Sequence, residues 1–227
     1  MEQLKSTQLK KLIHLIVKRH KEAPLIIGVT GNIASGKSTL AQKIFDILQS
    51  YSLKTQVVST DNFLKPNEIL VKEGLMKKKG FPESYNYELI NKFLGAIKNN
   101  NKITLPNYDQ KIHNLNWKAL TVVDSPDILI LEGLIVLQKA FQNIISETIY
   151  IEANQKDNYQ WFVKRNYDLH LDKQFHKSQF GFKKLIEFNW KEINLKNYMQ
   201  NILPYKSRAS IYLQMNFFHQ IKNYIFK

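Results

Sequence analysis

Residues 31–39 read GNIASGKST, and their types and spacing suit a chain of phosphates. Gly31 and Gly36 allow a tight turn in which backbone N–H groups point into one anion-sized hollow. Lys37 would reach the β- and γ-phosphates of a nucleoside triphosphate, and the Ser38 hydroxyl would ligate Mg²⁺. We therefore expect a nucleoside triphosphate and Mg²⁺ to bind here; the alternative is a chance glycine-rich turn. The predicted nucleotide-binding residues of the loop are Gly31, Asn32, Ile33, Ala34, Ser35, Gly36, Lys37, Ser38 and Thr39.

Two acidic residues stand where phosphoryl transfer would need them. Asp61 directly follows the run TQVVST, and Glu132 ends the run DILIL. In an open parallel sheet the site lies outside the carboxyl ends of the strands, so both side chains are expected there. The reaction needs one carboxylate to orient the hydroxyl and accept its proton, and another beside the metal. Asp61 is our candidate base, and Glu132 and Ser38 form the candidate metal site. A competing interpretation makes Asp61 the N-cap of the next helix.

The elements that would position these residues alternate between short apolar runs and longer helical patterns, which is typical of a mainly parallel sheet. We predict strands at residues 25–30, 55–60, 103–105, 127–132 and 148–153, and helices from near Lys37, Tyr87, Asp157 and Ser207. The expected fold is α/β, the three-layer α/β/α arrangement of P-loop NTPases, in a single domain over residues 1–227. Within it we expect an N-terminal amphipathic helix over residues 1–22 and a helical substrate-side region over residues 155–205.

Composition excludes several classes of protein. A hydrophobic content of 44% and an aromatic content of 12% exclude a disordered chain. No run of ~18 or more apolar residues offers a membrane span. The chain has no cysteine, so nothing requires an oxidising compartment and we expect a cytoplasmic protein. The net charge of +14 comes from scattered lysines without an arginine-rich arm. This pattern favours a solvated, lysine-rich surface or the attraction of small anionic substrates over a nucleic-acid partner.

The chain resembles the bacterial type I pantothenate kinases, which are relatives of uridine kinase and phosphoribulokinase. The resemblance rests on GNIASGKST, STDNFLKPNEIL, GLMKKKGFPESY, PDILILEGLIVLQ, WKEIN and QNILP, which run in the family's order. It implies transfer of the γ-phosphoryl group of ATP to the primary hydroxyl of pantothenate, the first step towards coenzyme A. It also implies a homodimer.

The resemblance implies roles for individual residues. Asp61 matches the aspartate that activates the hydroxyl, and Glu132 matches the glutamate beside Mg²⁺–ATP. Lys79 matches a lysine that faces the phosphates and the substrate. Arg165 matches an arginine at the transferred phosphate, where a fixed cation would stabilise the transition state. The predicted catalytic residues are Asp61, Lys37 and Arg165. The predicted substrate-binding residues are Asp61, Lys79, Tyr108, Gln110, His113, Phe162, Arg165, Leu169 and Asn201.

Lys79 and Arg165 also have structural interpretations that require no bound ligand. Lys79 ends the lysine run 77–79, and lysines before a glycine are typical of a helix C-terminus. Phe162, Arg165 and Leu169 share one helix face, which suits a pocket that is partly apolar and partly anionic. The same spacing is also typical of an amphipathic helix whose arginine reaches solvent.

Five positions depart from the family. Gln110 stands in place of a histidine, His113 and Phe162 in place of tyrosines, Leu169 in place of an aromatic residue or methionine, and Gln42 in place of an arginine. We expect the loss of cations at Gln42 and Gln110 to weaken feedback inhibition by coenzyme A. The alternative functions are a kinase of another small alcohol (a nucleoside, glycerate or a pantothenate-like compound) and a nucleotide-binding regulator without kinase activity.

Overall fold

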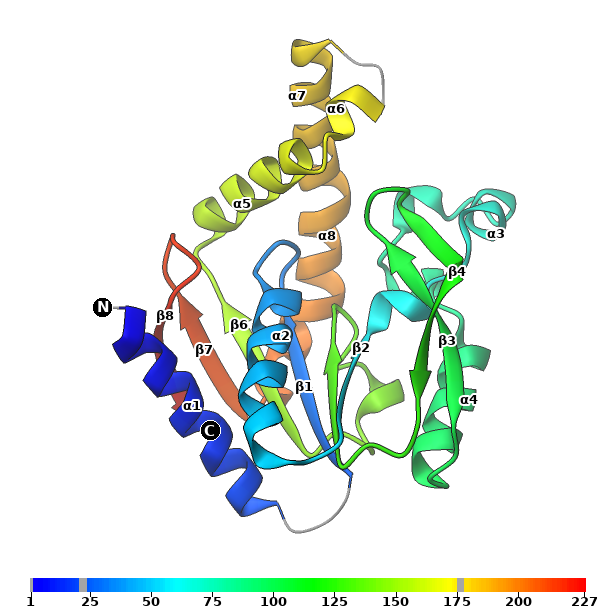
Figure 1. The fold of residues 1–227 in the computed structure, drawn as a ribbon. Coiled ribbons are helices and arrows are strands. Elements are labelled where there is room, and N and C mark those ends of the chain that lie inside the picture. Colours follow the sequence, from blue (N-terminus) through cyan, green and yellow to red (C-terminus); the bar gives the residue numbers. More distant parts are fainter. Residues whose placement is uncertain (1, 21–23, 175–177) are drawn as a thin grey trace.

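The computed structural model describes residues 2–20, 24–174 and 178–227, and within them six strands form the central sheet (Figure 1). The strands are β1 (Leu25–Gly31), β2 (Thr55–Ser59), β5 (Ile128–Glu132), β6 (Glu147–Glu152), β7 (Ile211–Met215) and β8 (Ile221–Phe226). Their order is β2-β5-β1-β6-β7-β8, and neighbours are parallel except β7 and β8. The predicted mainly parallel sheet is confirmed.

Helices cover both faces of this sheet. Because successive strand residues point to opposite faces, Ile27 and Ile26 of β1 enter different cores. Ile27 packs in the core that α1 (Glu2–Arg19) and α2 (Lys37–Leu48) complete, and Ile26 in the core that α4 (Tyr87–Lys98) completes. The sheet therefore lies between two helical layers, which confirms the predicted three-layer α/β/α class.

A separate antiparallel hairpin and several short helical turns lie beside the sheet (Figure 1). The hairpin strands are β3 (Ile103–Asp109) and β4 (Asn114–Val123). The short helical segments are η2 (Thr60–Phe63), α3 (Asn67–Lys72), η3 (Met76–Lys78), η4 (Pro82–Ser84), η1 (Gln49–Tyr51) and η5 (Lys139–Phe141). The sequence predicted only the first three residues of β3 and did not predict β4.

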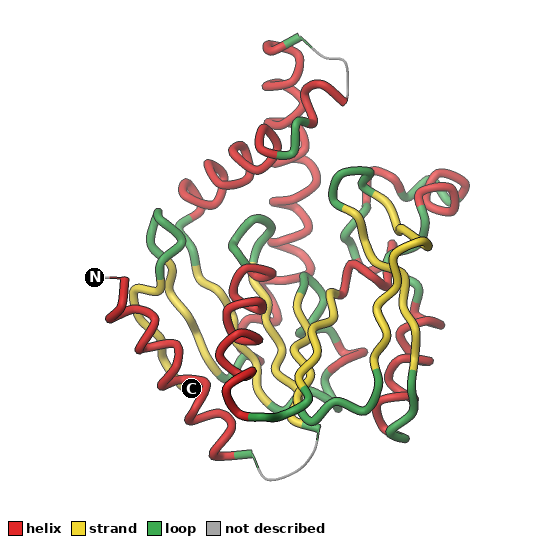
Figure 2. Tube along the Cα trace, viewed as in Figure 1, coloured by secondary structure: helices red, strands yellow, loops and turns green. Residues whose placement is uncertain are grey.

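A helical region rises above the ends of the strands, as Figure 2 shows in red. It consists of α5 (Gln155–Asp168), α6 (Leu171–Gln174), α7 (Gln179–Phe188), η6 (Asn189–Asn194), α8 (Leu195–Asn197), η7 (Tyr198–Ile202) and η8 (Leu203–Arg208). Its own apolar cluster contains Phe162, Leu171, Phe182, Ile186 and Trp190. This region corresponds to the helical segment expected at residues 155–205.

The helix expected from near Ser207 is wrong, because residues 211–226 form the hairpin of β7 and β8. Ile211 and Leu213 alternate into the core beside β6, and the Asn216 N–H donates to the Gln220 carbonyl at 2.9 Å to close the turn. The N-terminal helix spans Glu2–Arg19, and residues 1, 21 and 22 of the expected range lie outside the described residues. None of the described helices is long and apolar enough to cross a membrane.

Candidate active site

The loop between β1 and α2 has the backbone shape that the glycines predict. Gly31 has φ 148° and Gly36 has φ 90°, values that side-chain-bearing residues rarely adopt. A Cβ atom on Gly31 would lie 2.8 Å from the Ile151 carbonyl oxygen, so the close approach of β6 also excludes a side chain. The loop leads directly into α2, whose N-terminus adds a positive partial charge. The arrangement suits a phosphate chain.

Lys37 and Ser38 begin α2 and face the carboxylate at the end of β5. The Lys37 Nζ donates to the Asn32 carbonyl at 2.8 Å. Burial lowers the pKa of Lys37 to about 8, and the negative charges of Glu132 and Asp61 oppose this shift. The Ser38 Oγ donates to Glu132 Oε1 at 3.1 Å, and Glu132 is 6% exposed. Burial, and next the charge of Asp61, raise the pKa of Glu132.

Ser38 and Glu132 fit a magnesium ion, because a hydroxyl and a carboxylate side by side supply the hard oxygen ligands that Mg²⁺ prefers. Among the described residues, no group of three or more His, Asp and Glu side chains is arranged to hold a metal. Mg²⁺ usually keeps water and substrate phosphates as its other ligands, so a pair of protein ligands suffices here.

Asp61 lies in η2, immediately after β2. Ser59 caps η2, because its Oγ accepts from the Asp61 N–H at 3.3 Å, and Pro66 precedes α3. The interpretation of Asp61 as an N-cap is therefore wrong. Burial raises the pKa of the Asp61 carboxyl, and three neighbouring cations oppose the shift: Lys37, Arg165 and Lys79. The carboxylate thus lies among the side chains predicted to surround the transferred phosphate.

Lys79 differs from the lysines before it. Its Nζ donates to Asn67 Oδ1 at 2.6 Å and to the His113 carbonyl, and it lies 4.9 Å from the centre of the Tyr108 ring. Burial lowers its pKa to about 8 against the charge of Asp61. Lys77 and Lys78 end the helical turn η3, as the local interpretation expects. Only the last lysine of the run points into the site.

The hairpin of β3 and β4 brings three predicted residues to the site. The Gln110 Oε1 accepts a hydrogen bond from Arg165, which joins the hairpin to α5. The Tyr108 N–H donates to Asn62 Oδ1 at 2.9 Å, and burial followed by the charge of Asp61 raises the pKa of its hydroxyl. The His113 Nε2 is buried without a hydrogen-bond partner in the structure, and burial lowers the pKa of this imidazole.

The other three predicted residues lie in the helical region. Phe162 is 6% exposed in the apolar cluster, and Leu169 packs against that cluster. Asn201 Nδ2 donates to Asn197 Oδ1 at 3.0 Å, and Asn197 Nδ2 donates to the Gly80 carbonyl at 2.7 Å. Asn201 is therefore linked to the residue that follows Lys79. Leu169 also lines the larger cavity at the phosphate loop together with Arg165, whereas Phe162 is placed only in the apolar cluster.

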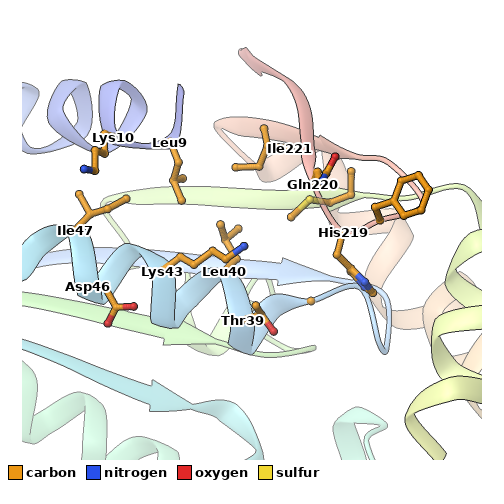
Figure 3. A pocket seen from close by; sticks show the side chains of 13 residues that line it. Leu9, Lys10, Thr39, Leu40, Lys43, Asp46, Ile47, His219, Gln220 and Ile221 are labelled. Atoms are coloured by element: carbon orange, nitrogen blue, oxygen red, sulfur yellow. The ribbon is translucent and has the colours of Figure 1, made fainter. Parts of the chain in front are cut away.

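Two adjoining cavities lie at the phosphate loop. The larger, of about 720 Å³, contains Lys37 and Ser38 together with Gln110 and Arg165. The second, of about 490 Å³, lies between α1, α2 and the turn of β7 and β8 (Figure 3). Figure 3 shows side chains of α2 facing those of α1 and of the turn. Both cavities are lined by Gly36, Thr39, Phe218 and His219, so they meet at the loop.

Residues 26–215 match the Phosphoribulokinase / Uridine kinase family. The chain belongs to this family. A pantothenate kinase from Agrobacterium fabrum is 35% identical over 224 residues, which span 88% of this chain and 70% of that protein. A pantothenate kinase from Serratia proteamaculans is 33% identical over 231 residues, 89% of this chain and 72% of that protein.

Solved structures of low sequence identity share the fold. The D-glycerate 3-kinase from Cryptococcus neoformans has a TM-score of 0.70 and 14% identity, and the match covers 99% of this chain and 98% of that one. At this identity the likeness shows the fold alone.

Sequence reasoning missed several residues that touch the site. Asn67 Oδ1 accepts a hydrogen bond from the Lys79 Nζ, and Asn62 Oδ1 accepts one from the Tyr108 N–H. His219 reaches the phosphate loop from the turn of β7 and β8, with its Nε2 3.3 Å from the Ala34 carbonyl. The two asparagines lie in DNFLKPN, close to the predicted base, and that nearness was the available signal. His219 had none, because its turn falls in a segment predicted to be helical.

Proposed function

We propose that the protein is a pantothenate kinase, which transfers the γ-phosphoryl group of Mg²⁺–ATP to the primary hydroxyl of pantothenate. The observation that carries the proposal is the convergence of Asp61 with Lys37, Lys79 and Arg165 at the phosphate loop, and each of the three cations acts on the pKa of the Asp61 carboxyl. The family and the pantothenate kinases among its relatives support the same substrate. A cytoplasmic location remains a prediction from the composition, and a homodimer remains a prediction of the resemblance.

The proposed reaction uses the residues as follows. Asp61 orients the alcohol and accepts its proton as the new oxygen–phosphorus bond forms. The bond between the γ-phosphorus and the bridging oxygen breaks, and ADP leaves. The cations of Lys37, Lys79 and Arg165 stabilise the charge on the transferring group. Magnesium, held by Ser38 and Glu132, would neutralise charge on the phosphates.

The two cavities suggest how ATP lies in the site. Lys37 and Ser38 line the larger cavity, which suits the phosphates and the alcohol. The second cavity meets it at Gly36 and Thr39. Leu9 of α1 and Leu40 and Ile47 of α2 give it an apolar surface that a nucleoside could pack against, beside charged side chains that include Lys43 and Asp46. We therefore assign the nucleoside to the cavity in Figure 3.

ADP release in the presence of pantothenate tests the proposal. Asp61→Asn is expected to lower kcat by about 10²–10⁴-fold, because it removes the proton acceptor while preserving the shape. Asp127→Asn is the matched control, because this carboxylate stands before the opposite end of β5, where its Oδ2 accepts from the Lys54 N–H at 2.8 Å. It is expected to retain wild-type turnover.

The two possible failures are distinguishable. If wild-type protein releases no ADP with pantothenate, the substrate is wrong, and a panel of nucleosides, glycerate and pantothenate analogues identifies another alcohol kinase. If no alcohol stimulates ADP release although ATP binds, the chain is a nucleotide-binding regulator. If Asp61→Asn turns over pantothenate like wild type, only the assigned base is wrong.

A further inference from the structure

Asn158 is a buried polar residue of α5 to which the reaction above gives no role. It is 2% exposed, and its Nδ2 donates to the Ile33 carbonyl of the phosphate loop at 2.5 Å. A buried amide needs a partner, and an asparagine side chain can find one in the backbone of its own segment. This one lies 125 positions away in the sequence, on the loop that would hold the phosphates.

Ile33, which Asn158 contacts, and its neighbour Ala34 lie in the phosphate loop. Ile33 and Ala34 pack against the apolar cluster of the helical region, and Ala34 has φ 57°. A residue with a Cβ in this left-handed conformation is held there at some cost, so surrounding contacts must fix it. Asn158 supplies one such contact at Ile33, and the His219 Nε2 lies 3.3 Å from the Ala34 carbonyl.

The direction of the Ile33 carbonyl matters for the anion hollow. In the peptide that joins Ile33 to Ala34, the carbonyl and the N–H point in opposite directions, because the unit is planar and trans. A donor that fixes the direction of the Ile33 carbonyl therefore also fixes the opposite direction of the Ala34 N–H. The same helix face carries Arg165, seven residues and about two turns further along α5.

We propose that Asn158 is a positioning residue, which ties α5 to the phosphate loop and fixes the Ile33–Ala34 peptide so that its N–H faces the bound phosphates. It acts through the loop and touches no reacting atom. The inference rests on the proposed use of ATP, but not on pantothenate, because it concerns phosphate binding alone.

Binding of Mg²⁺–ATP, ADP and adenosine to the purified protein tests the role. Asn158→Asp keeps the size of the side chain but turns an oxygen towards the Ile33 carbonyl, and Asn158→Leu removes both polar groups. We expect each variant to bind Mg²⁺–ATP and ADP roughly tenfold more weakly, the loss of about one hydrogen bond, with adenosine affinity unchanged. In turnover, the KM for ATP is expected to rise more than kcat falls.

Asn166→Asp is the matched control, since it makes the same change on the same helix. Asn166 Nδ2 donates to the Phe162 carbonyl at 2.7 Å, within α5. It is expected to leave the affinity for all three ligands unchanged. Equal losses for ATP and adenosine, or wild-type ATP affinity in both Asn158 variants, would overturn the role.

Wild-type protein provides a test that does not depend on the folding of a variant. Mg²⁺–ADP is expected to slow amide hydrogen exchange in Gln155–Phe162 of α5, because the occupied loop and this segment are tied. Adenosine, which has no phosphates, is expected to leave the exchange there unchanged. The proposed link between α5 and the phosphate loop is contradicted if Mg²⁺–ADP leaves exchange in this segment unchanged. It is also contradicted if adenosine slows the exchange as much as Mg²⁺–ADP does. If wild-type protein binds ATP but phosphorylates no pantothenate, the proposed substrate fails while this test stands.

Discussion

At the scale of single residues, the site balances buried carboxylates against buried cations. Lys37 and Lys79 are both held with a pKa of about 8, because burial disfavours the ammonium more than the neighbouring carboxylates favour it. Burial raises the pKa of Asp61 for the same reason, since it disfavours the carboxylate. Bound phosphates would bring negative charge to the two lysines and restore their preference for the protonated form.

These shifts predict the dependence of activity on pH. A lysine carries its charge below its pKa, so Lys37 and Lys79 of the free enzyme lose their protons as the pH rises through about 8. We expect kcat/KM for ATP to fall above that pH. The value of kcat should hold to higher pH, because bound phosphates keep the lysines protonated. On the acid side, kcat/KM should rise with pH as the Asp61 carboxyl loses its proton.

Replacing Lys79 with arginine distinguishes its ionisation from that of Lys37, because a guanidinium stays charged well above pH 8. Lys79→Arg is expected to make the alkaline fall of kcat/KM shallower, because one of two ionisations is removed. Lys78→Arg is the control, because the Lys78 Nζ pairs with Glu83 Oε1 at 2.8 Å on the surface. A wild-type kcat/KM that stays constant through the range where both lysines titrate contradicts the assignment.

Gln42 carries the prediction about feedback by coenzyme A. Its Nε2 donates to Asp46 Oδ1 at 2.9 Å on the exposed face of α2, so this position offers no cation to an anionic inhibitor. Gln42→Arg is expected to strengthen inhibition by coenzyme A about tenfold, the value of one charged hydrogen bond. Gln49→Arg, at the exposed C-terminal end of the same helix, is the control. Inhibition of wild-type protein by micromolar coenzyme A, unchanged in Gln42→Arg, would refute the weakened feedback.

At the scale of elements, the parallel strands β1, β2, β5 and β6 were predictable, whereas β4, β7 and β8 were not. All five residues of β5 are buried, so the strand reads as a continuous apolar run. β4 and β8 are exposed on one face, and their mixed composition shows no such run. The segment of β7 and β8 also contains enough scattered apolar residues to suggest a helix. Its hairpin is stabilised instead by pairing with β6, a contact distant in sequence.

The same distinction applies to the candidate site. Residues at the ends of the predicted strands, such as Asp61 and Glu132, could be placed from the sequence because a parallel sheet collects those ends. Asn158 and His219 could not, because each reaches the phosphate loop from an element whose packing depends on tertiary contacts. The bond between Gln110 and Arg165 likewise joins two elements that the sequence does not relate.

At the scale of the whole molecule, the helical region has an apolar cluster of its own, separate from the two cores that enclose the sheet. The tip of the phosphate loop, Ile33 and Ala34, packs against that cluster and joins it to the sheet. A substitution that destabilises the helical region should therefore weaken nucleotide binding before it destabilises the sheet. A substitution that destabilises the core under α4 should lower the stability of the whole molecule.

Two matched phenylalanine variants test this difference. Phe182 of the helical cluster is 1% exposed and Phe93 of the core under α4 is 0% exposed, so each change to alanine removes a buried ring worth about 3–5 kcal/mol. Phe182→Ala is expected to speed amide exchange in α5 and α7 and to weaken ATP binding, with exchange in β1 and β5 near wild type. Phe93→Ala is expected to lower the thermal midpoint and speed exchange in the sheet as well. If Phe182→Ala lowers protection in β1 and β5 as much as Phe93→Ala does, the helical region and the sheet unfold as one unit, and nucleotide binding cannot be tuned through the helices alone.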